Sequence, residues 1–139
     1  MGNPDEPIED EFLIGGNERR AIVLVDYDSS WPVRFQDERA KLTTALGTEA
    51  IGIEHIGSTA VPGLAAKPII DVHVHIWPDG DPAVTAYLAF RHRLRSSIAD
   101  RDLYAATKRH LAQQDWPTMD HYADAKSDVI LQILSRTDS

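Results

Sequence analysis

The sequence predicts an α/β protein of α+β type, in which a small mixed sheet with a βαββ core precedes a C-terminal half of about three helices. Three short apolar runs, bounded by glycine or proline, predict the strands. They cover residues 21–25, 51–56 and 68–77. After the Pro78-Asp79-Gly80 turn the apolar residues recur at helical spacing, which predicts helices at about 82–97, 100–114 and 118–136.

One further helix is predicted between the first and second strands. Ser29 or Ser30 can cap its N-terminus, and Pro32 suits its first turn. Apolar residues spaced along one side continue to Leu46, and Gly47 follows as a helix terminator. This helix completes the βαββ order.

The chain of 139 residues is long enough for one domain and far shorter than the roughly 250 residues of a typical (β/α)8 barrel. Residues 1–20 are rich in Asp, Glu, Gly, Asn and Pro, which is typical of a flexible extension. We therefore expect a flexible N-terminal extension at 1–20 and a single domain at 21–136.

The formal net charge is −8, which argues against broad nucleic-acid binding through phosphate neutralisation. A small anionic ligand remains compatible with that charge if basic side chains gather locally. The absence of cysteine fits a reducing compartment, and no run of 18 apolar residues is present. We expect a cytoplasmic protein that makes no membrane contact.

The segment from Gly57 to Ile76 carries the clearest functional signal. Gly57 and Ser58 follow a predicted strand, where a glycine lets the backbone approach a phosphate and a serine adds a hydroxyl donor. Asp71 interrupts an apolar strand, and a carboxylate at such a position is costly unless a cation or hydrogen-bond donors compensate it. Asp71 is therefore the first candidate for catalysis and metal binding, with Glu54 on the adjacent strand as a second carboxylate.

His73 and His75 lie on the same face of the third predicted strand as Asp71, because side chains alternate along a strand. Alternate histidines can ligate a transition metal, so a metal-dependent hydrolase that uses His73 and His75 is a remote alternative. Such enzymes are barrels with further ligands on later strands, and this chain has no such strands after His75.

The predicted helical half carries basic residues at helical spacing. Tyr104 and Lys108 are four residues apart, as are Tyr122 and Lys126, so each pair is expected on one helix face. Cations beside apolar faces suit a phosphate chain, although ordinary surface cations give the same pattern. The candidate phosphate ligands are Gly57, Ser58, Lys67, Arg91, Lys108 and Lys126.

Residues 53–71, IEHIGSTAVPGLAAKPIID, resemble the signature of the GrpB family, whose fold is similar to that of nucleotidyltransferases. The resemblance extends over about residues 22–134. It implies a nucleotide or phosphorylated small molecule as ligand and a divalent cation, Mg²⁺, as cofactor. Within it Gly57 and Ser58 match the glycine-serine of the nucleotidyltransferase pattern, and Asp71 matches the first metal-binding carboxylate. Nucleotidyl transfer is the implied reaction, and His73 stands two residues after Asp71, where histidine is a poor ligand for Mg²⁺.

The resemblance also has a rival implication and one departure. The family is similar to a domain fused to dephospho-CoA kinases, which implies a non-catalytic accessory or folding-assistance domain that binds a protein partner. In this chain the strand that ends at Asp71 continues directly into residues that resemble a later strand of the family, so an internal segment is missing. A homodimer that covers the opened sheet edge is one expected consequence.

Overall fold

The computed structural model describes residues 21–50, 52–67 and 75–136, and helices form most of that part of the chain. The α-helices are α1 (Trp31–Leu46), α2 (Pro82–Ser96), α3 (Ile98–Ala112), α4 (Met119–Asp124) and α5 (Ser127–Leu134). Two short 3₁₀ helices, η1 (Gly47–Glu49) and η2 (Ser58–Ala60), lie in the connections. No helix in these three ranges has the length and apolar character needed to cross a membrane.

The predicted βαββ sheet core is wrong for the part of the chain that is described, since it contains no strand. The first predicted strand makes a single antiparallel bridge, in which Val25 and Ala66 exchange backbone hydrogen bonds of 2.9 and 3.0 Å. A ladder requires a partner strand along several residues, and within the described ranges residues 53–56 have none. Residue 51 and residues 68–74, which include most of the third predicted strand, fall outside the description.

Helix α1 has the predicted bounds but not the predicted cap. Pro32 occupies its first turn and Gly47 follows its end with φ of 56°. Ser30 is the N-cap residue but makes no side-chain cap, so the predicted serine cap is not formed. The N–H of Ser30 donates to the Asp28 carboxylate over 2.8 Å, which fixes the turn that leads into the helix.

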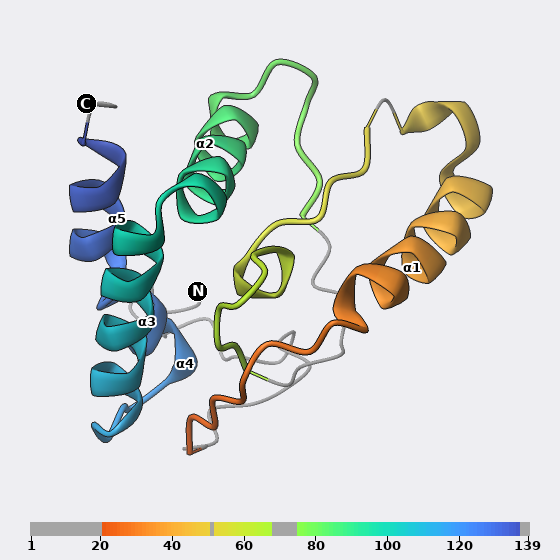
Figure 1. Ribbon diagram of the computed structural model, residues 1–139. Coiled ribbons are helices and arrows are strands. Elements are labelled where there is room, and N and C mark those ends of the chain that lie inside the picture. The colour runs from red at the N-terminus through yellow and green to blue at the C-terminus, as the bar shows by residue number, and fades with distance from the viewer. Residues whose placement is uncertain (1–20, 51, 68–74, 137–139) are drawn as a thin grey trace, which may run out of the picture.

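The core lies where η2 and the connection after it meet α2, α3 and α5. Leu64, Leu94 and Ile133 are almost fully buried there, together with Val61, Tyr104, Ala105 and Val129. Figure 1 shows α2, α3 and α5 grouped on one side of segment 52–67, with α1 on the other. Burying one leucine or isoleucine side chain contributes about 1.5–3 kcal/mol, so this cluster holds η2 against the helices.

The predicted helix at 118–136 is in fact two helices. The N–H of Lys126 donates to the carbonyl of Ala123, three residues back, over 3.2 Å, which tightens the chain between α4 and α5. Periodicity alone misses this break because Tyr122, Val129 and Ile133 remain buried on one side through it.

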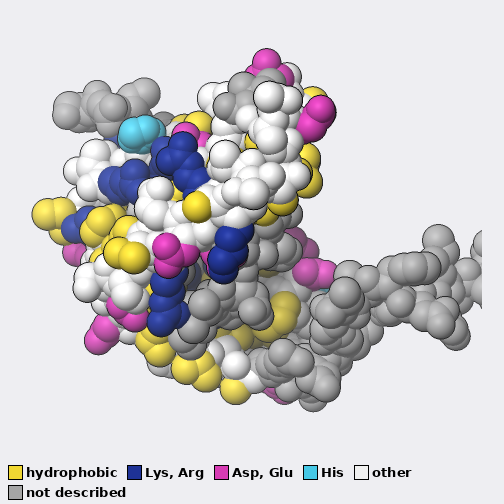
Figure 2. Space-filling view, turned by 90° about the vertical axis from the view of Figure 1, so that its right-hand side faces the viewer, with side chains coloured by type: hydrophobic (Ala, Val, Ile, Leu, Met, Phe, Trp, Pro, Cys, Tyr) yellow, Lys and Arg dark blue, Asp and Glu magenta, His cyan; other side chains and the backbone are white. Residues whose placement is uncertain are grey.

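Helix α1 joins the rest through its N-terminal half. Trp31 is its buried residue, and the ring of Phe35 stacks on the ring of His55 with centroids 4.6 Å apart. Most other α1 side chains are exposed. Figure 2 views the molecule from that side and shows acidic and basic side chains interspersed, with no continuous patch of either sign.

A buried carboxylate ties three helices together. Asp100, in the first turn of α3, is 1% exposed and accepts from Arg93 of α2 and from Arg136, which follows α5. Burial on its own would raise the pKa of Asp100, but hydrogen bonds with Arg93, Ser97 and Arg136 outweigh it and hold the pKa below the usual range. The side chain of Ser97 also caps α3 by accepting from the Asp100 N–H over 3.2 Å.

We expect Asp100→Asn to lower the free energy of unfolding by about 3 kcal/mol, because two guanidinium groups lose their buried counter-charge. Urea denaturation at pH 7 measures the change. The matched control is Asp102→Asn, an exposed carboxylate in the same helix, for which we expect a change within about 0.5 kcal/mol. Equal effects of the two substitutions would contradict this account of the carboxylate.

Candidate anion site

The site is built on segment 52–67, which crosses the middle of the molecule without forming a sheet. Gly57 adopts φ of 80°, a backbone conformation that L side chains rarely take, and so turns the chain into η2. A Cβ at Gly57 would meet no atom within 4 Å, so the backbone angle, not crowding, requires glycine there.

Basic side chains of α2 satisfy carbonyl groups of this segment. Arg91 donates to the carbonyl of His55 over 2.9 Å, and Arg95 donates to the carbonyl of Ala60 over 2.9 Å. These bonds replace those of a β-ladder, since a buried carbonyl without a donor is costly. They fix Ser58 between two anchored points of the backbone.

Lys108 of α3 also reaches this segment. Its Nζ lies 2.8 Å from the Oγ of Ser58 and donates to the carbonyl of Ala65, and the residue is only 3% exposed. Ser58 itself is partly exposed. The lysine thus links η2 to the backbone near the Val25–Ala66 bridge and brings its amine against a hydroxyl group.

Two more lysines lie at this place, both over the ring of Tyr122. The Nζ of Lys126 lies 4.7 Å from the ring centroid of Tyr122, and the Nζ of Lys67 lies 5.5 Å from the same centroid. The Nζ of Lys108 lies 5.3 Å from the ring centroid of Tyr104. We call Lys67, Lys108 and Lys126, with Ser58, the three-lysine site.

The three ammonium groups share one environment and destabilise one another's charge. Burial, followed by the charges of Lys126, Arg109 and Lys67, lowers the pKa of Lys108 to about 7. Burial also lowers the pKa of Lys67 and, together with the charge of Lys67, that of Lys126. Burial raises the pKa of Tyr104 to about 12, aided by Tyr122 and opposed by a hydrogen bond with Ser58.

No carboxylate compensates these charges within the described ranges. The ion pairs found there join Lys41 to Glu38, Arg91 to Glu54, and Arg93 and Arg136 to Asp100. None includes Lys67, Lys108 or Lys126. A cluster of partly buried cations with no counter-charge among the described residues is the arrangement expected of a site for an anion.

The structure brings Ser58, Lys67, Lys108 and Lys126 together, all four of which the sequence analysis named. Gly57 is placed next to them by its position in the chain. Arg91 is held elsewhere, since its Nη1 donates to the carboxylate of Glu54 over 2.7 Å. The carbonyl of Ala65 and the anchoring role of Arg95 were not foreseen, because sequence spacing does not reveal a contact between α3 and a distant loop.

The metal-binding prediction stays a prediction. Asp71 and His73 lie outside the described residues. His75 is exposed and its ring stacks on that of Trp77 with centroids 5.1 Å apart. No group of three or more His, Cys, Asp or Glu side chains in the described part of the chain is arranged to hold a metal ion.

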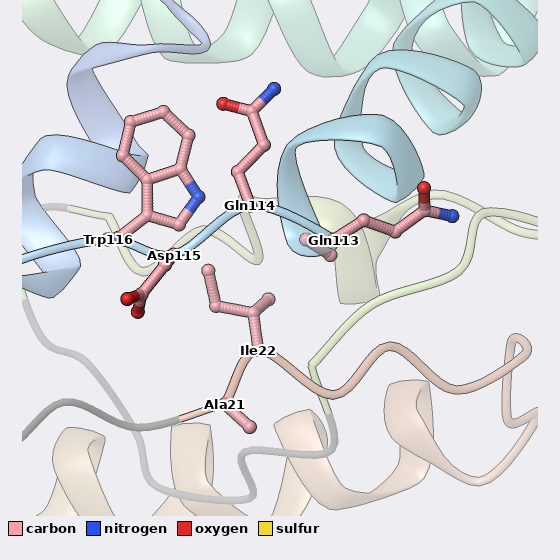
Figure 3. A pocket seen from close by; sticks show the side chains of 7 residues that line it. Ala21, Ile22, Gln113, Gln114, Asp115 and Trp116 are labelled. Atoms are coloured by element: carbon pink, nitrogen blue, oxygen red, sulfur yellow. The ribbon is translucent and has the colours of Figure 1, made fainter.

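A separate hollow of about 290 Å³ lies beside the end of α3. Figure 3 shows the side chain of Ile22 pointing toward the turn that carries Gln113 and Trp116. The indole Nε1 of Trp116 donates to the carbonyl of Leu111 over 2.7 Å, so this donor already has a hydrogen-bond partner within the fold. This hollow contains none of the three lysines, and its lining offers an anion no positive charge.

Comparison with known proteins gives the family. The model of the family described as GrpB protein matches residues 21–74 and 71–136. The chain belongs to the GrpB family. A UPF0157 protein of Streptomyces coelicolor is 39% identical over 165 aligned positions, which cover 89% of this chain and 88% of that protein.

The GrpB fold is also seen in a solved structure. The crystal structure of the conserved protein GrpB from Enterococcus faecalis matches with a TM-score of 0.64 and 24% identity, and the match covers 81% of this chain and 97% of that one. A shorter likeness links this chain to the dephospho-CoA kinase of Mycolicibacterium paratuberculosis, with 39% identity over 61 residues, 42% of this chain and 15% of the kinase.

The buried lysine makes stability depend on pH. The pKa of Lys108 is about 7 in the folded chain and near 10.4 in the unfolded one, so between these values the unfolded state binds more protons. The free energy of unfolding therefore rises with pH, by up to about 1.4 kcal/mol per pH unit from this group. We expect denaturation midpoints to increase from pH 7 to pH 9.5.

Comparison of the natural protein with Lys108→Met isolates this contribution, because other groups also titrate. The variant is expected to show a flatter profile over the same range. If the two profiles run parallel, Lys108 does not carry the depressed pKa.

Proposed function

We propose that this GrpB-family chain binds a phosphorylated small molecule, with a nucleotide as the leading class, at the three-lysine site. The observation that supports this most directly is the meeting of Lys67, Lys108 and Lys126 around two tyrosine rings without a carboxylate among the described residues. A phosphate group brought among them would offset the burial and the repulsion that together lower the pKa values of Lys108 and Lys126.

The size of the charge effect favours phosphate over a neutral ligand. Two unit charges about 4 Å apart interact by about 4 kcal/mol at the effective dielectric constant near a protein surface. The site offers the charges of Lys67 and Lys126 and, when Lys108 is protonated, a third, and Ser58 adds a hydroxyl next to Lys108. A dianionic or more highly charged phosphate matches this set better than a single carboxylate does.

A divalent cation, Mg²⁺, belongs to the proposal through Asp71. In this proposal Asp71 would hold the cation, which would neutralise part of the phosphate charge, since Mg²⁺ usually binds through one or two carboxylates and the phosphates of its substrate. Glu54 is already paired with Arg91, so it serves as a metal ligand only if that ion pair opens. The described residues favour binding, and they supply no second carboxylate for the chemistry of nucleotidyl transfer.

We also propose that the chain lacks an internal segment present in its relatives. The two stretches matched by the family model meet at residues 71–74. The alignment with the Streptomyces coelicolor protein extends over 165 positions, although the chain has 139 residues. Both facts support a missing segment next to Asp71. We propose that a second copy of the chain covers the edge that the missing segment would otherwise protect, which would give a homodimer.

Calorimetry with ATP, GTP, CTP and UTP, each with and without Mg²⁺, tests the binding proposal. We expect binding of at least one nucleotide, weakened about tenfold or more by Lys126→Gln, because a charge-assisted hydrogen bond contributes about 1.5–3 kcal/mol. The matched control is Lys41→Gln, which removes an exposed lysine of α1 and leaves affinity unchanged. Absence of heat with all four nucleotides and with inorganic phosphate, in a folded protein, would refute the proposal.

Asp71→Ala tests the contribution of the metal to affinity separately from that of the lysines. If Asp71 holds the cation, the substitution removes the gain in affinity that Mg²⁺ gives and leaves metal-free binding intact. Equal Mg²⁺ dependence in Asp71→Ala and the natural protein would exclude this role for Asp71.

Anion binding is expected to strengthen as pH falls from 8.5 to 6.5. A bound anion raises the pKa of Lys108 from about 7, so binding takes up a proton and is favoured where the free site is partly deprotonated. Sulfate titrated at several pH values measures this, since its charge is constant over the range. An affinity that does not vary with pH would contradict the assignment of Lys108 to the anion site.

A second candidate, a protein-binding accessory domain, has its own support. Part of the chain is similar to part of a dephospho-CoA kinase, and the described helices leave Ile98 and Leu131 each 65% exposed. Sedimentation of the chain mixed with a separately produced dephospho-CoA kinase tests it. A complex that Leu131→Asp abolishes would favour this candidate, and independent sedimentation of the two proteins would oppose it.

A further inference from the structure

Ser58 and Lys108 have the arrangement of a nucleophile and its base. The Nζ of Lys108 is 2.8 Å from the Oγ of Ser58, within the range in which a base takes a proton from a hydroxyl. Lys108 is 3% exposed, whereas Ser58 is partly exposed. A substrate that reaches the hydroxyl therefore need not reach the amine, and the amine stays shielded from water.

The surroundings favour the neutral amine that a base requires. Lys108 is buried and is faced by Lys67 from segment 52–67, by Lys126 from the junction of α4 and α5, and by Arg109 from α3. Burial, followed by the charges of these three cations, lowers the pKa of Lys108 to about 7. Tyr104 and Tyr122 stay protonated near neutral pH, since burial raises the pKa of each.

The hydrogen bonds also suit a neutral amine. An uncharged Nζ has two hydrogens and one lone pair, so it can donate to the carbonyl of Ala65 and accept from the hydroxyl of Ser58. The carbonyl holds the amine in place, and the lone pair then points at the hydroxyl that would react. A protonated Lys108 would donate to both oxygens and could not activate Ser58.

We propose that Ser58 and Lys108 form a serine–lysine pair that transfers an acyl group from a carboxylic ester or thioester carrying negative charge near its reacting carbonyl. Lys67 and Lys126 supply the attraction for that charge, since both stand at the site. This activity goes beyond anion binding and does not depend on a phosphate as the ligand.

The steps of the reaction balance. The Oγ of Ser58 forms a bond with the carbonyl carbon while its proton passes to the Nζ of Lys108. The bond from carbon to the leaving oxygen or sulfur then breaks, and Lys108 returns the proton to that leaving group. Water next attacks the acyl-serine, gives a proton to Lys108, and the acid departs as the Ser58 hydroxyl is restored.

A fluorophosphonate probe with a fluorophore tests the pair directly. Attack by Ser58 forms an oxygen–phosphorus bond and expels fluoride, and mass spectrometry of the digested protein locates the adduct. We expect labelling at Ser58, its loss in Ser58→Ala, and a rate at least one hundredfold lower in Lys108→Met. Thr59→Val is the matched control, because the Thr59 hydroxyl is bonded to His55 and not to a lysine.

The pH profile of the natural protein gives a second test that needs no altered lysine. The labelling rate should rise about tenfold per pH unit below pH 7 and level off above about pH 8, as Lys108 loses its proton. Lys126→Gln should move the midpoint to higher pH, because it removes one of the charges that lower the pKa of Lys108. Circular dichroism confirms that each variant is folded.

Three results would overturn the pair: no adduct at Ser58 in the folded natural protein, labelling that Lys108→Met leaves unchanged, or a rate that continues to rise with hydroxide up to pH 10. Calorimetry distinguishes this outcome from that of the binding proposal. Ser58 labelling without any phosphate affinity refutes the binding proposal alone, and phosphate affinity without labelling refutes the pair alone.

Discussion

The structure depends on how segment 52–67 satisfies its backbone without a sheet. Its carbonyl groups at His55, Ala60 and Ala65 accept from Arg91, Arg95 and Lys108. A β-ladder would have supplied neutral N–H donors at these positions. Because the donors are cationic side chains of α2 and α3, the same contacts that hold the loop in place also concentrate positive charge around it.

Gathering positive charge in this way destabilises the folded state, and the size of the effect differs among Arg91, Arg95 and Lys108. Arg91 is paired with Glu54, and Arg95 is exposed to solvent. Lys108 is buried and has no carboxylate among the described residues, which leaves loss of its proton as the available relief. The shift in its pKa is thus a consequence of using a lysine as an internal donor to the loop.

The sequence predicts the long helices well because their signals are local. Pro32 and Gly47 mark α1, and the apolar spacing marks α2 and α3 within a few residues. The sheet was predicted wrongly because a β-branched run such as residues 21–25 only favours extended backbone, whereas a strand also needs a partner at the right distance. The role of Asp100 was missed for a similar reason, since its two arginine partners lie 7 and 36 residues away.

The candidate site was predicted in part because helical spacing selected Lys108 and Lys126 and the family resemblance selected Ser58. Neither signal contains the distance from Lys108 to Ser58, which arises only when α3 packs against segment 52–67.

The short distance between Lys108 and Ser58 gives the lysine two mutually exclusive roles. As an ammonium it attracts an anion, and as an amine it can deprotonate Ser58. An anion bound among the lysines raises the pKa of Lys108 and removes the base, whereas its departure restores the base. With a pKa of about 7 in the free chain, neither state of Lys108 is far in free energy from the other at neutral pH. Ligand charge, more than any movement of the backbone, would then decide which chemistry the site performs.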